Sequence, residues 1–261
     1  MLFAFSIENT AIHLGAFDGD ALVFDSRVST SHERTVDEYA VLFRDIFSLY
    51  GASVGSIEAA VFSSVVRPLS QRIARAVEKV LHVKPLQVGP GVRTGLDIRT
   101  EIASQVGADI VANAVASIAL APPPVVFVDF GTATTMTGIN ENGELCGVLI
   151  CPGVRTSLEA LSAGAAELPR IAVDGPKGLF GRNTVDSMTN GLAYGHAAMV
   201  DGLLDRIAEE WSRKEPAVFA TGEWAEAVVP HCRRREGIRV VPELTLLGLK
   251  RIHETNARPR P

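Results

Sequence analysis

A short segment near the middle of the sequence, VDFGTATT, carries the residue types that a phosphate-binding loop needs. Asp129 ends an apolar run and could hold a cation or its water shell. Gly131 would let backbone N–H groups approach a phosphate, and the hydroxyl of Thr132 adds a donor. The segment therefore indicates phosphate chemistry. An isolated D-x-G-T can equally be a tight hairpin turn, because Asp and Gly favour turns, and both interpretations stay open here.

The N-terminal stretch FSIENT can be laid on this segment, and it differs where the chemistry would lie. Ser6 falls on Asp129 and Glu8 falls on Gly131. In each case a second turn follows, FDGDAL after the first segment and NENGEL after the other, if one extra residue is allowed. The chain therefore contains the same supersecondary unit twice.

Hydrophobic periodicity predicts the elements that would position these segments. Period-2 patterns rich in β-branched and aromatic residues predict strands, and apolar residues at helical spacing predict helices. On this basis strands are expected at 4–7, 11–17, 21–28, 59–66 and 85–89, with helices at 35–50, 69–83 and from about 107 to the prolines at 122–124. A strand-turn-strand unit then begins again at residue 125.

The duplication predicts an α/β protein of two similar lobes, with the actin-like and sugar-kinase (ribonuclease H-like) fold and a nucleotide cleft between the lobes. Residues 1–117 would form the first lobe and residues 118–261 the second, with the C-terminal helix able to pack back on the first lobe.

Composition favours small-molecule chemistry in the cytoplasm. The formal charge of −5 and the absence of a basic run argue against nucleic acid and anionic membranes as partners. No basic region precedes the first apolar run, which is interrupted by polar residues, so neither a signal peptide nor a membrane span is expected. Cys146, Cys151 and Cys232 have no metal-binding spacing and fit reduced thiols.

Many segments in order then carry a family resemblance across nearly the whole chain. They are FSIENTAIHLGAFDGD, SSVV (63–66), TGLDIR (94–99), GADIVANAVA (107–116), VDFGTATT, VLICPGVRTSLEALSAGAAELPRI, GRNTVDSMTNGLAYG (181–195), ATGEWA and ELTLLGLKRIHE. In this the sequence resembles the type III pantothenate kinases, bacterial enzymes that use ATP to phosphorylate pantothenate to 4'-phosphopantothenate, the first step of coenzyme A synthesis.

The resemblance implies ATP, Mg²⁺ and a monovalent cation (K⁺ or NH₄⁺) as cofactors, and a homodimer whose site residues are shared across the interface. It implies that Asp109 is the general base and that Asp129 lies at the metal and phosphate site. The implied nucleotide-binding residues are Asn9, Thr10, Gly131, Thr132, Thr134, Thr221 and Gly222. The implied substrate-binding positions are Gly107, Thr100, Ile110 and Thr184, the last reaching across the dimer.

Asp109 admits two interpretations that are compatible with each other. A carboxylate within reach of an attacking hydroxyl can orient it and accept its proton during phosphoryl transfer. Aspartate is also a favoured N-cap residue, here for a helix expected to begin near Ile110.

Several positions depart from the family pattern, which places D-x-G-N-T in the first loop. Ser6 and Glu8 replace the carboxylate and the glycine there, and Ile110 and Thr100 replace the arginine and tyrosine of the acceptor site. Glu223 stands in for the second glycine of the adenosine turn, where it would narrow the nucleotide pocket or begin a helix, EWAEAVV. Thr137 also differs, where an aspartate is frequent.

These departures leave three hypotheses for function. The first is a pantothenate kinase. The second is a catalytically impaired homologue that serves as a binding or regulatory subunit, or as a partner in a mixed dimer. The third is a kinase for a different small alcohol, since Ile110 and Thr100 make the acceptor pocket less cationic.

Overall fold

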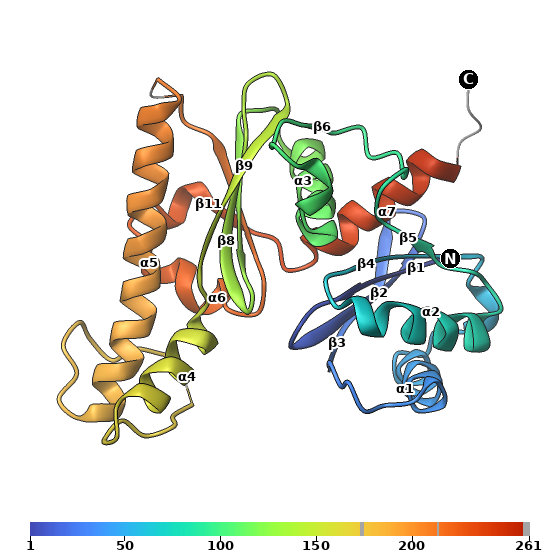
Figure 1. The fold of residues 1–261 in the computed structure, drawn as a ribbon, viewed down its shortest axis with the longest axis horizontal. Coiled ribbons are helices and arrows are strands. Elements are labelled where there is room, and N and C mark those ends of the chain that lie inside the picture. The colour runs from blue at the N-terminus through green and yellow to red at the C-terminus, as the bar shows by residue number, and fades with distance from the viewer. Residues whose placement is uncertain (173–174, 213, 258–261) are drawn as a thin grey trace. The chain divides into compact units, whose positions relative to one another are not determined.

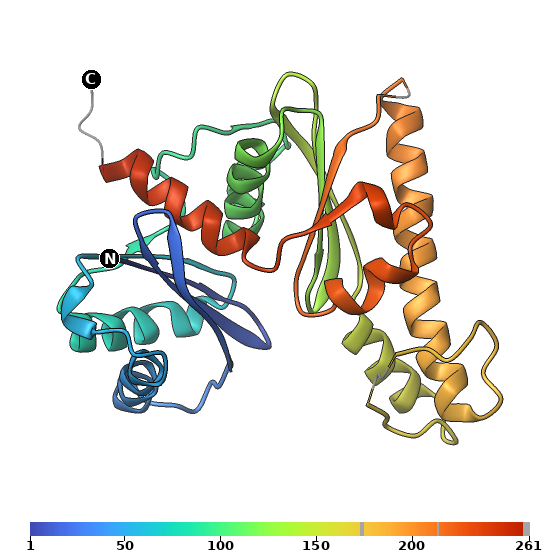
Figure 2. The same ribbon diagram turned by 180° about the vertical axis from the view of Figure 1, so that it is seen from behind.

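The computed structural model describes residues 1–172, 175–212 and 214–257, which divide into two compact units. The first unit comprises residues 1–96, 100–116 and 243–257. The second comprises residues 97–99 and 117–242. Each unit is built on its own sheet, and Figures 1 and 2 show the two sheets from opposite sides.

The sheet of the first unit begins with an antiparallel meander. Its strands are β1 (Leu2–Ile7), β2 (Ala11–Asp18), β3 (Ala21–Ser29), β4 (Ala59–Ser64) and β5 (Leu86–Gln87), in the spatial order β3-β2-β1-β4-β5. β4 runs parallel to β1, and β5 runs parallel to β4. The strands expected from period-2 alternation are therefore present.

Helices cover both faces of this sheet. α1 (Val36–Leu49) and α2 (Arg67–Leu81) pack on one face, where Phe3 and Phe5 stack within a cluster that also contains Phe43. α7 (Leu244–Ala257) packs on the other face, with Leu246 Cδ1 only 2.7 Å from where a side chain on Gly15 would begin. α3 (Ala108–Leu120) lies against α7, because Gly248 allows close approach to the backbone of Ala112.

The sheet of the second unit repeats this plan. Its strands are β7 (Val125–Phe130), β8 (Ala133–Ile139), β9 (Glu144–Pro152), β10 (Ala217–Thr221), β11 (Ile238–Val240) and β6 (Asp97–Ile98), in the order β11-β10-β7-β8-β9-β6. The order β9-β8-β7-β10-β11 matches β3-β2-β1-β4-β5 strand for strand. β10 is parallel to β7, as β4 is to β1. The predicted duplication is confirmed.

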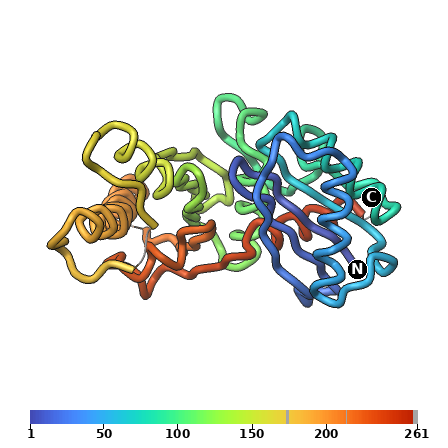
Figure 3. Tube along the Cα trace, turned by 90° about the horizontal axis from the view of Figure 1, so that it is seen from below, coloured from blue at the N-terminus to red at the C-terminus, as the bar shows by residue number. Residues whose placement is uncertain are grey.

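The helices of the second unit are α4 (Val154–Gly164), α5 (Thr184–Glu210) and α6 (Ala225–Val228). α5 has 27 residues, and its N-cap is Asn183, whose side chain accepts a hydrogen bond from the backbone N–H of Asp186. α4 lies beside α5, and Figure 3 shows α5 nearly end-on. Short 3₁₀ turns complete the chain at Val54–Ser56, Ala103–Gln105, Val229–His231 and Arg235–Gly237.

None of the helices in the described ranges combines the length and apolar character that a bilayer crossing requires.

Candidate active site

The second of the two equivalent loops connects β7 to β8 and consists of Gly131 and Thr132. Asp129 is the penultimate residue of β7. It lies opposite Thr135 on β8 and opposite Thr221 on β10. The carboxylate is thus placed at the end of the central strand of the sheet, where hydrogen bonds on both sides fix its backbone.

Two glycines from distant segments hold this loop closely. A side chain on Gly153, at the N-terminus of α4, would collide with the backbone carbonyl groups of Gly131 and Thr132. Gly222 has φ +94°, and a Cβ there would lie 2.5 Å from Asp129 Oδ1 and 2.6 Å from the backbone of Phe130. Glycine is required at both positions, since no other residue allows such close approach.

The threonines of this region have different environments. Thr132 is exposed, and its carbonyl accepts a 2.7 Å hydrogen bond from Thr156 Oγ1. Thr221 is buried and donates to the carbonyl of Pro242 at 3.2 Å. Thr134 is 1% exposed, as buried as Thr137, and neither hydroxyl has a hydrogen-bond partner within the described chain. Thr132 is therefore accessible to solvent at this loop. Thr134, two residues later on β8, is buried with its hydroxyl group unsatisfied.

The equivalent loop of the first unit connects β1 to β2 and is one residue longer. Ser6 lies where Asp129 lies in the second unit, but it is 1% exposed and accepts a 3.0 Å hydrogen bond from Ser63 Oγ. Asn9 and Thr10 are exposed. The carbonyl of Glu8 accepts from Thr30 Oγ1 at 2.7 Å, so the backbone of this loop is also fixed.

Asp109 lies in the first turn of α3, which begins at Ala108. The predicted start near Ile110 is wrong by two residues, so Asp109 is inside the helix and not at its N-cap. Its Oδ1 accepts a 2.8 Å hydrogen bond from the backbone N–H of Ile110, and a Cβ at Gly107 would lie against this carboxylate unless it moved. Burial raises the pKa of Asp109, and the backbone hydrogen bonds offset only part of that effect.

Glu223 does not begin a helix, because α6 starts two residues later at Ala225. Of the two alternatives for Glu223, the start of a helix is therefore wrong, and the narrowing of the nucleotide pocket stays a prediction. Glu223 instead forms an ion pair with Arg155 of α4, with Oε1 2.5 Å from Nη2. The turn stays attached to the loop through the backbone N–H of Trp224, which donates to Phe130 at 3.3 Å.

Thr184 is the exposed first residue of α5, and it lines a cavity of about 690 Å³ between α4 and α5. The other residues of that cavity are mainly apolar, among them Leu161, Leu168 and Met188. None of the residues that line it belongs to the Gly131–Thr132 loop, although Pro152, which lines the cavity, pairs with Ala133 directly after that loop.

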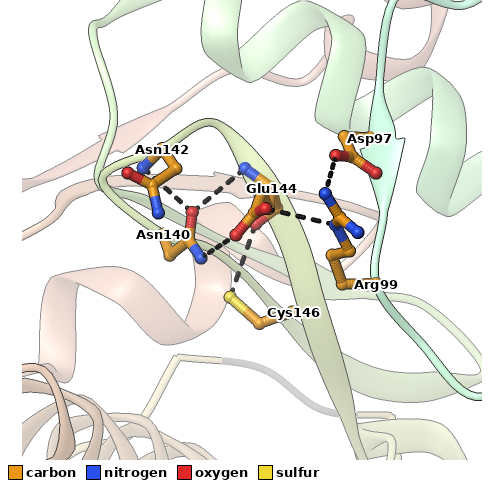
Figure 4. A network of polar contacts seen from close by, with 6 residues as sticks. All are labelled: Asp97, Arg99, Asn140, Asn142, Glu144 and Cys146. Carbon is orange, nitrogen blue, oxygen red and sulfur yellow. Dashed lines mark hydrogen bonds and ion pairs between the residues drawn. The ribbon is translucent and has the colours of Figure 1, made fainter.

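Arg99 ends the predicted acceptor segment TGLDIR and joins the second unit through a polar network (Figure 4). Its guanidinium contacts Asp97 Oδ2 at 2.7 Å and Glu144 Oε1 at 3.1 Å. Asn140 Nδ2 donates to the other oxygen of Glu144 at 2.8 Å. This hydrogen bond, together with the charge of Arg99, lowers the pKa of Glu144. Thr100, the next residue, is half-buried.

The side chains near the second loop could hold a hard cation that is also bound by phosphate. They could not enclose a cation with protein ligands alone. Among the described residues no group of three His, Cys, Asp or Glu side chains converges as a metal site. Mg²⁺ usually binds proteins through one or two carboxylates plus phosphates and water. Asp129, near the end of β7 and beside the Gly131–Thr132 loop, fits that role. Ser6 and Ser63 offer only hydroxyl groups.

The structure thus brings Asp129, Gly131, Thr132 and Gly222 together, as the sequence predicts for a phosphate loop. Sequence reasoning missed the two residues of α4 that brace it, Gly153 and Thr156. The Pro-Gly pair directly after an apolar strand is a signal that could have drawn attention to Gly153. Thr30 and Ser63, which fix the first loop, had no comparable signal.

Solved structures share this fold at low sequence identity. A conserved putative Baf family transcriptional activator from Campylobacter jejuni covers 97% of this chain and 98% of its own, with TM-score 0.60 and 14% identity. A component of (R)-2-hydroxyglutaryl-CoA dehydratase from Acidaminococcus fermentans has TM-score 0.58 and 13% identity, covering 98% of this chain and 99% of its own. A putative 2-dehydro-3-deoxygalactonokinase from Sinorhizobium meliloti has TM-score 0.57 and 11% identity, covering 100% and 98%.

Two duplicated sheets with a phosphate-type loop on the central strand define an α/β protein of the actin-like and sugar-kinase fold. Sequence comparison narrows this class. The family profile described as "Type III pantothenate kinase" matches residues 2–206. Type III pantothenate kinases are 41% identical in Geobacillus thermodenitrificans, over 100% of both chains, and 42% identical in Bacillus cytotoxicus, over 98% of this chain and 97% of that one. The chain belongs to the type III pantothenate kinase family.

Proposed function

We propose that this chain uses ATP to phosphorylate pantothenate, the reaction of its family. The observation that carries the proposal is the intact second loop, in which Asp129 stands near the end of β7, beside the side-chain-free backbone of Gly131, and packs against Gly222. Full-length identity of 41% to named type III pantothenate kinases supports the choice of acceptor.

Asp109 is the proposed general base. Its carboxylate is fixed by the N–H of Ile110, so it keeps one orientation toward an acceptor hydroxyl. The raised pKa makes this carboxylate a stronger base than an exposed aspartate. Because the base must be deprotonated, kcat/KM should fall as the pH drops through that raised pKa, at a higher pH than an ordinary aspartate would give.

Asp129 is the proposed ligand of Mg²⁺, whose role when bound is to neutralise charge on the transferred phosphoryl group. Thr132 and the backbone of Gly131 would contact the nucleotide phosphates, and Gly222 would border the adenosine. Thr134, Thr221, Asn9 and Thr10 complete the proposed nucleotide set, although the hydroxyl of Thr221 is already bonded to Pro242. A monovalent cation, K⁺ or NH₄⁺, is part of the same proposal.

Gly107, Thr100 and Ile110 are the proposed acceptor-site positions in the first unit. Ile110 lacks a charged group for the pantothenate carboxylate, and a guanidinium there would typically contribute ~1.5–3 kcal/mol. We therefore expect a higher KM for pantothenate than Ile110→Arg would show.

A homodimer is proposed from the apolar surface around Thr184. Phe180 is 88% exposed and Leu179 is 65% exposed, and both precede the N-terminus of α5. Val185 and Leu161 are also exposed, and the cavity between α4 and α5 is lined mainly by apolar side chains. An exposed apolar patch of this kind is typical of a protein interface. Thr184 would then act in the partner's site. The free cysteines fit a cytoplasmic setting.

The buried Ser6–Ser63 pair favours a second candidate function. A first loop without a carboxylate would suit a chain that has lost turnover and acts as a binding or regulatory subunit, or as a mixed-dimer partner. A kinase for a less anionic small alcohol is favoured by Ile110.

The test is transfer of labelled phosphate from ATP to pantothenate at saturating Mg²⁺ and K⁺, using protein shown to be folded, with Asp109→Asn as the control. The proposal expects formation of 4'-phosphopantothenate and a loss of about 10²–10⁴-fold in kcat for the variant. No transfer to pantothenate by folded protein would contradict it. Transfer to another alcohol in a substrate panel would select the third hypothesis, and no transfer at all would select the second.

A further inference from the structure

The ion pair between Arg155 and Glu223 joins two segments that both touch the second loop. Gly153, two residues before Arg155, packs against the backbone of Gly131 and Thr132. Gly222, directly before Glu223, packs against Asp129 and Phe130. The two charged residues are therefore one and two positions along the chain from glycines that pack against the loop to which the proposed function assigns the nucleotide phosphates.

The pair is poorly suited to a purely structural role. Its side chains are 47% and 43% exposed, and ion pairs so accessible to water contribute little to folding stability. The loop is already held by backbone packing at both glycines and by the hydrogen bond from Thr156 to Thr132. Losing the pair should leave the loop in place.

Arg155 has both the chemistry and the room to serve another partner. A guanidinium binds phosphate through paired N–H donors, and it binds carboxylate with the same geometry. Among the described residues Arg155 also lines a cavity of about 670 Å³, together with Arg170, Leu158 and Trp224. Its side chain thus borders open space between α4 and Trp224.

We propose that Arg155 is the cation that contacts the nucleotide phosphates, and that Glu223 competes with the nucleotide for it. This inference rests on the proposed function. It makes Glu223 a specificity-determining residue that weakens nucleotide binding by holding Arg155, and it makes release of the ion pair a part of nucleotide entry.

The proposal fixes the sign of two substitutions. Glu223→Gln removes the competing carboxylate while keeping the side-chain volume, so affinity for MgATP and MgADP should rise about three- to tenfold. Arg155→Met removes the phosphate contact and should lower both affinities at least tenfold. Adenosine has no phosphate, so its affinity should change less than twofold in either variant.

Asp205→Asn is the matched control. Asp205 pairs with Arg234 in the same unit, with Oδ1 2.5 Å from Nη2, the same nitrogen–oxygen separation as in the Arg155–Glu223 pair, and with similar exposure of 59% and 41%. This change removes one negative charge from an ion pair that does not adjoin the loop, and it should leave nucleotide affinity unchanged.

Calorimetric titration of the folded full-length variants with MgATP, MgADP and adenosine tests the proposal. Weaker MgATP binding by Glu223→Gln would overturn it and would show that the pair closes over the nucleotide. Equal affinities in wild type, Glu223→Gln and Arg155→Met would overturn it while leaving the proposed function intact. Absence of nucleotide binding in every protein would overturn both, whereas binding by Glu223→Gln alone would support the competition directly.

Discussion

The two equivalent loops have the same backbone plan and opposite chemistry. Ser6 and Asp129 occupy the same place on the central strand of their sheets, opposite Ser63 and Thr221 on the parallel neighbour. In the first unit the Ser6 hydroxyl is buried and hydrogen-bonded to the hydroxyl of Ser63. In the second unit the Asp129 carboxylate packs against Gly222. Duplication has preserved the backbone scaffold, while the carboxylate is present in the second copy and absent from the first.

The supports around the loops differ in the same way. After β3, Thr30 hydrogen-bonds the first loop at the carbonyls of Glu8 and Thr10. After β9, Gly153 and Thr156 brace the second. In the first unit Ser64 of β4 lies opposite Ile7, the last residue of the central strand β1. The equivalent position in the second unit, directly after β10, is Gly222. Backbone from two other segments therefore packs directly against the second loop, at Gly153 and Gly222.

The largest expected difference between the two loops is in the catalytic efficiency, kcat/KM, of variants at Asp129 and Ser6. Asp129→Asn should lower kcat/KM for phosphoryl transfer at least about 10²-fold, because positioned charge dominates catalysis of this reaction. Ser6→Ala removes only a buried hydroxyl pair and should change kcat/KM less than about threefold. Steady-state assays of both variants check this. Comparable losses in the two variants would mean that the first loop still takes part in catalysis.

The second comparison concerns the stability cost of adding a side chain at Gly222 and at Gly19. Gly222→Ala forces a Cβ into Asp129 and Phe130 at φ +94° and should destabilise the fold by about 3 kcal/mol. Gly19→Ala is the control, since its φ is +57° with nothing within 4 Å, and it should cost about 1 kcal/mol. Denaturant unfolding measures both. The idea of a tightly packed second loop fails if the two costs are equal.

The third comparison concerns Glu8, which stands where the second loop has Gly131. Two unit charges ~5 Å apart repel by roughly 3 kcal/mol at an effective dielectric near 20. Glu8→Gly should therefore tighten MgATP binding by up to about a hundredfold if this loop still faces nucleotide. The exposed Glu33→Gln, in the same unit, controls for net charge. Unchanged affinity would place the first loop outside the nucleotide site.

Restoring the family residues at both altered positions of the first loop, with Ser6→Asp and Glu8→Gly, is a poor test of nucleotide binding. Ser6 is 1% exposed and bonded to Ser63, so Ser6→Asp would bury a carboxylate beside a hydroxyl. Burial of a charge without a counter-charge is costly, and a loss of stability would obscure any gain in affinity.

The smallest expected effect is on the pH dependence of the first unit. His13 lies opposite Ser6, where the second unit has Thr135. Burial lowers the pKa of His13 despite its 2.7 Å contact with Asp25, with Arg27 lowering it further and Glu243 raising it. The unfolded chain therefore takes up a proton below about pH 6.5 that the folded chain resists, so stability falls on acidification.

His13→Gln removes that proton uptake. It should make the decline in unfolding free energy between pH 7 and pH 5 shallower than in the wild type, as measured by denaturant unfolding at each pH. An unaltered pH slope in the variant would show that His13 is not responsible.

Much of the fold could be predicted from the sequence, because strand alternation and the repeat are local signals. The strands at 4–7, 11–17 and 21–28 and the second copy from residue 125 were predicted in this way. The environment of Ser6 could not be, since its partner Ser63 lies 57 residues away on a parallel strand.

The site was predictable where it lies within one segment. Asp129 and Gly131 follow from D-x-G-T, but the packing of Gly153 and the pairing of Arg155 with Glu223 depend on tertiary structure. The expected helix start at Glu223 was wrong, because its carboxylate binds a guanidinium 68 residues away and the helix begins after Trp224.

Calorimetric titration of the folded chain with MgATP tests most directly whether the second loop carries the nucleotide function. We expect one nucleotide bound per chain, at least tenfold weaker binding in Asp129→Asn, and affinity within twofold of wild type in Ser6→Ala. Binding that survives Asp129→Asn but is lost in Ser6→Ala, or no binding by wild type, would contradict the account.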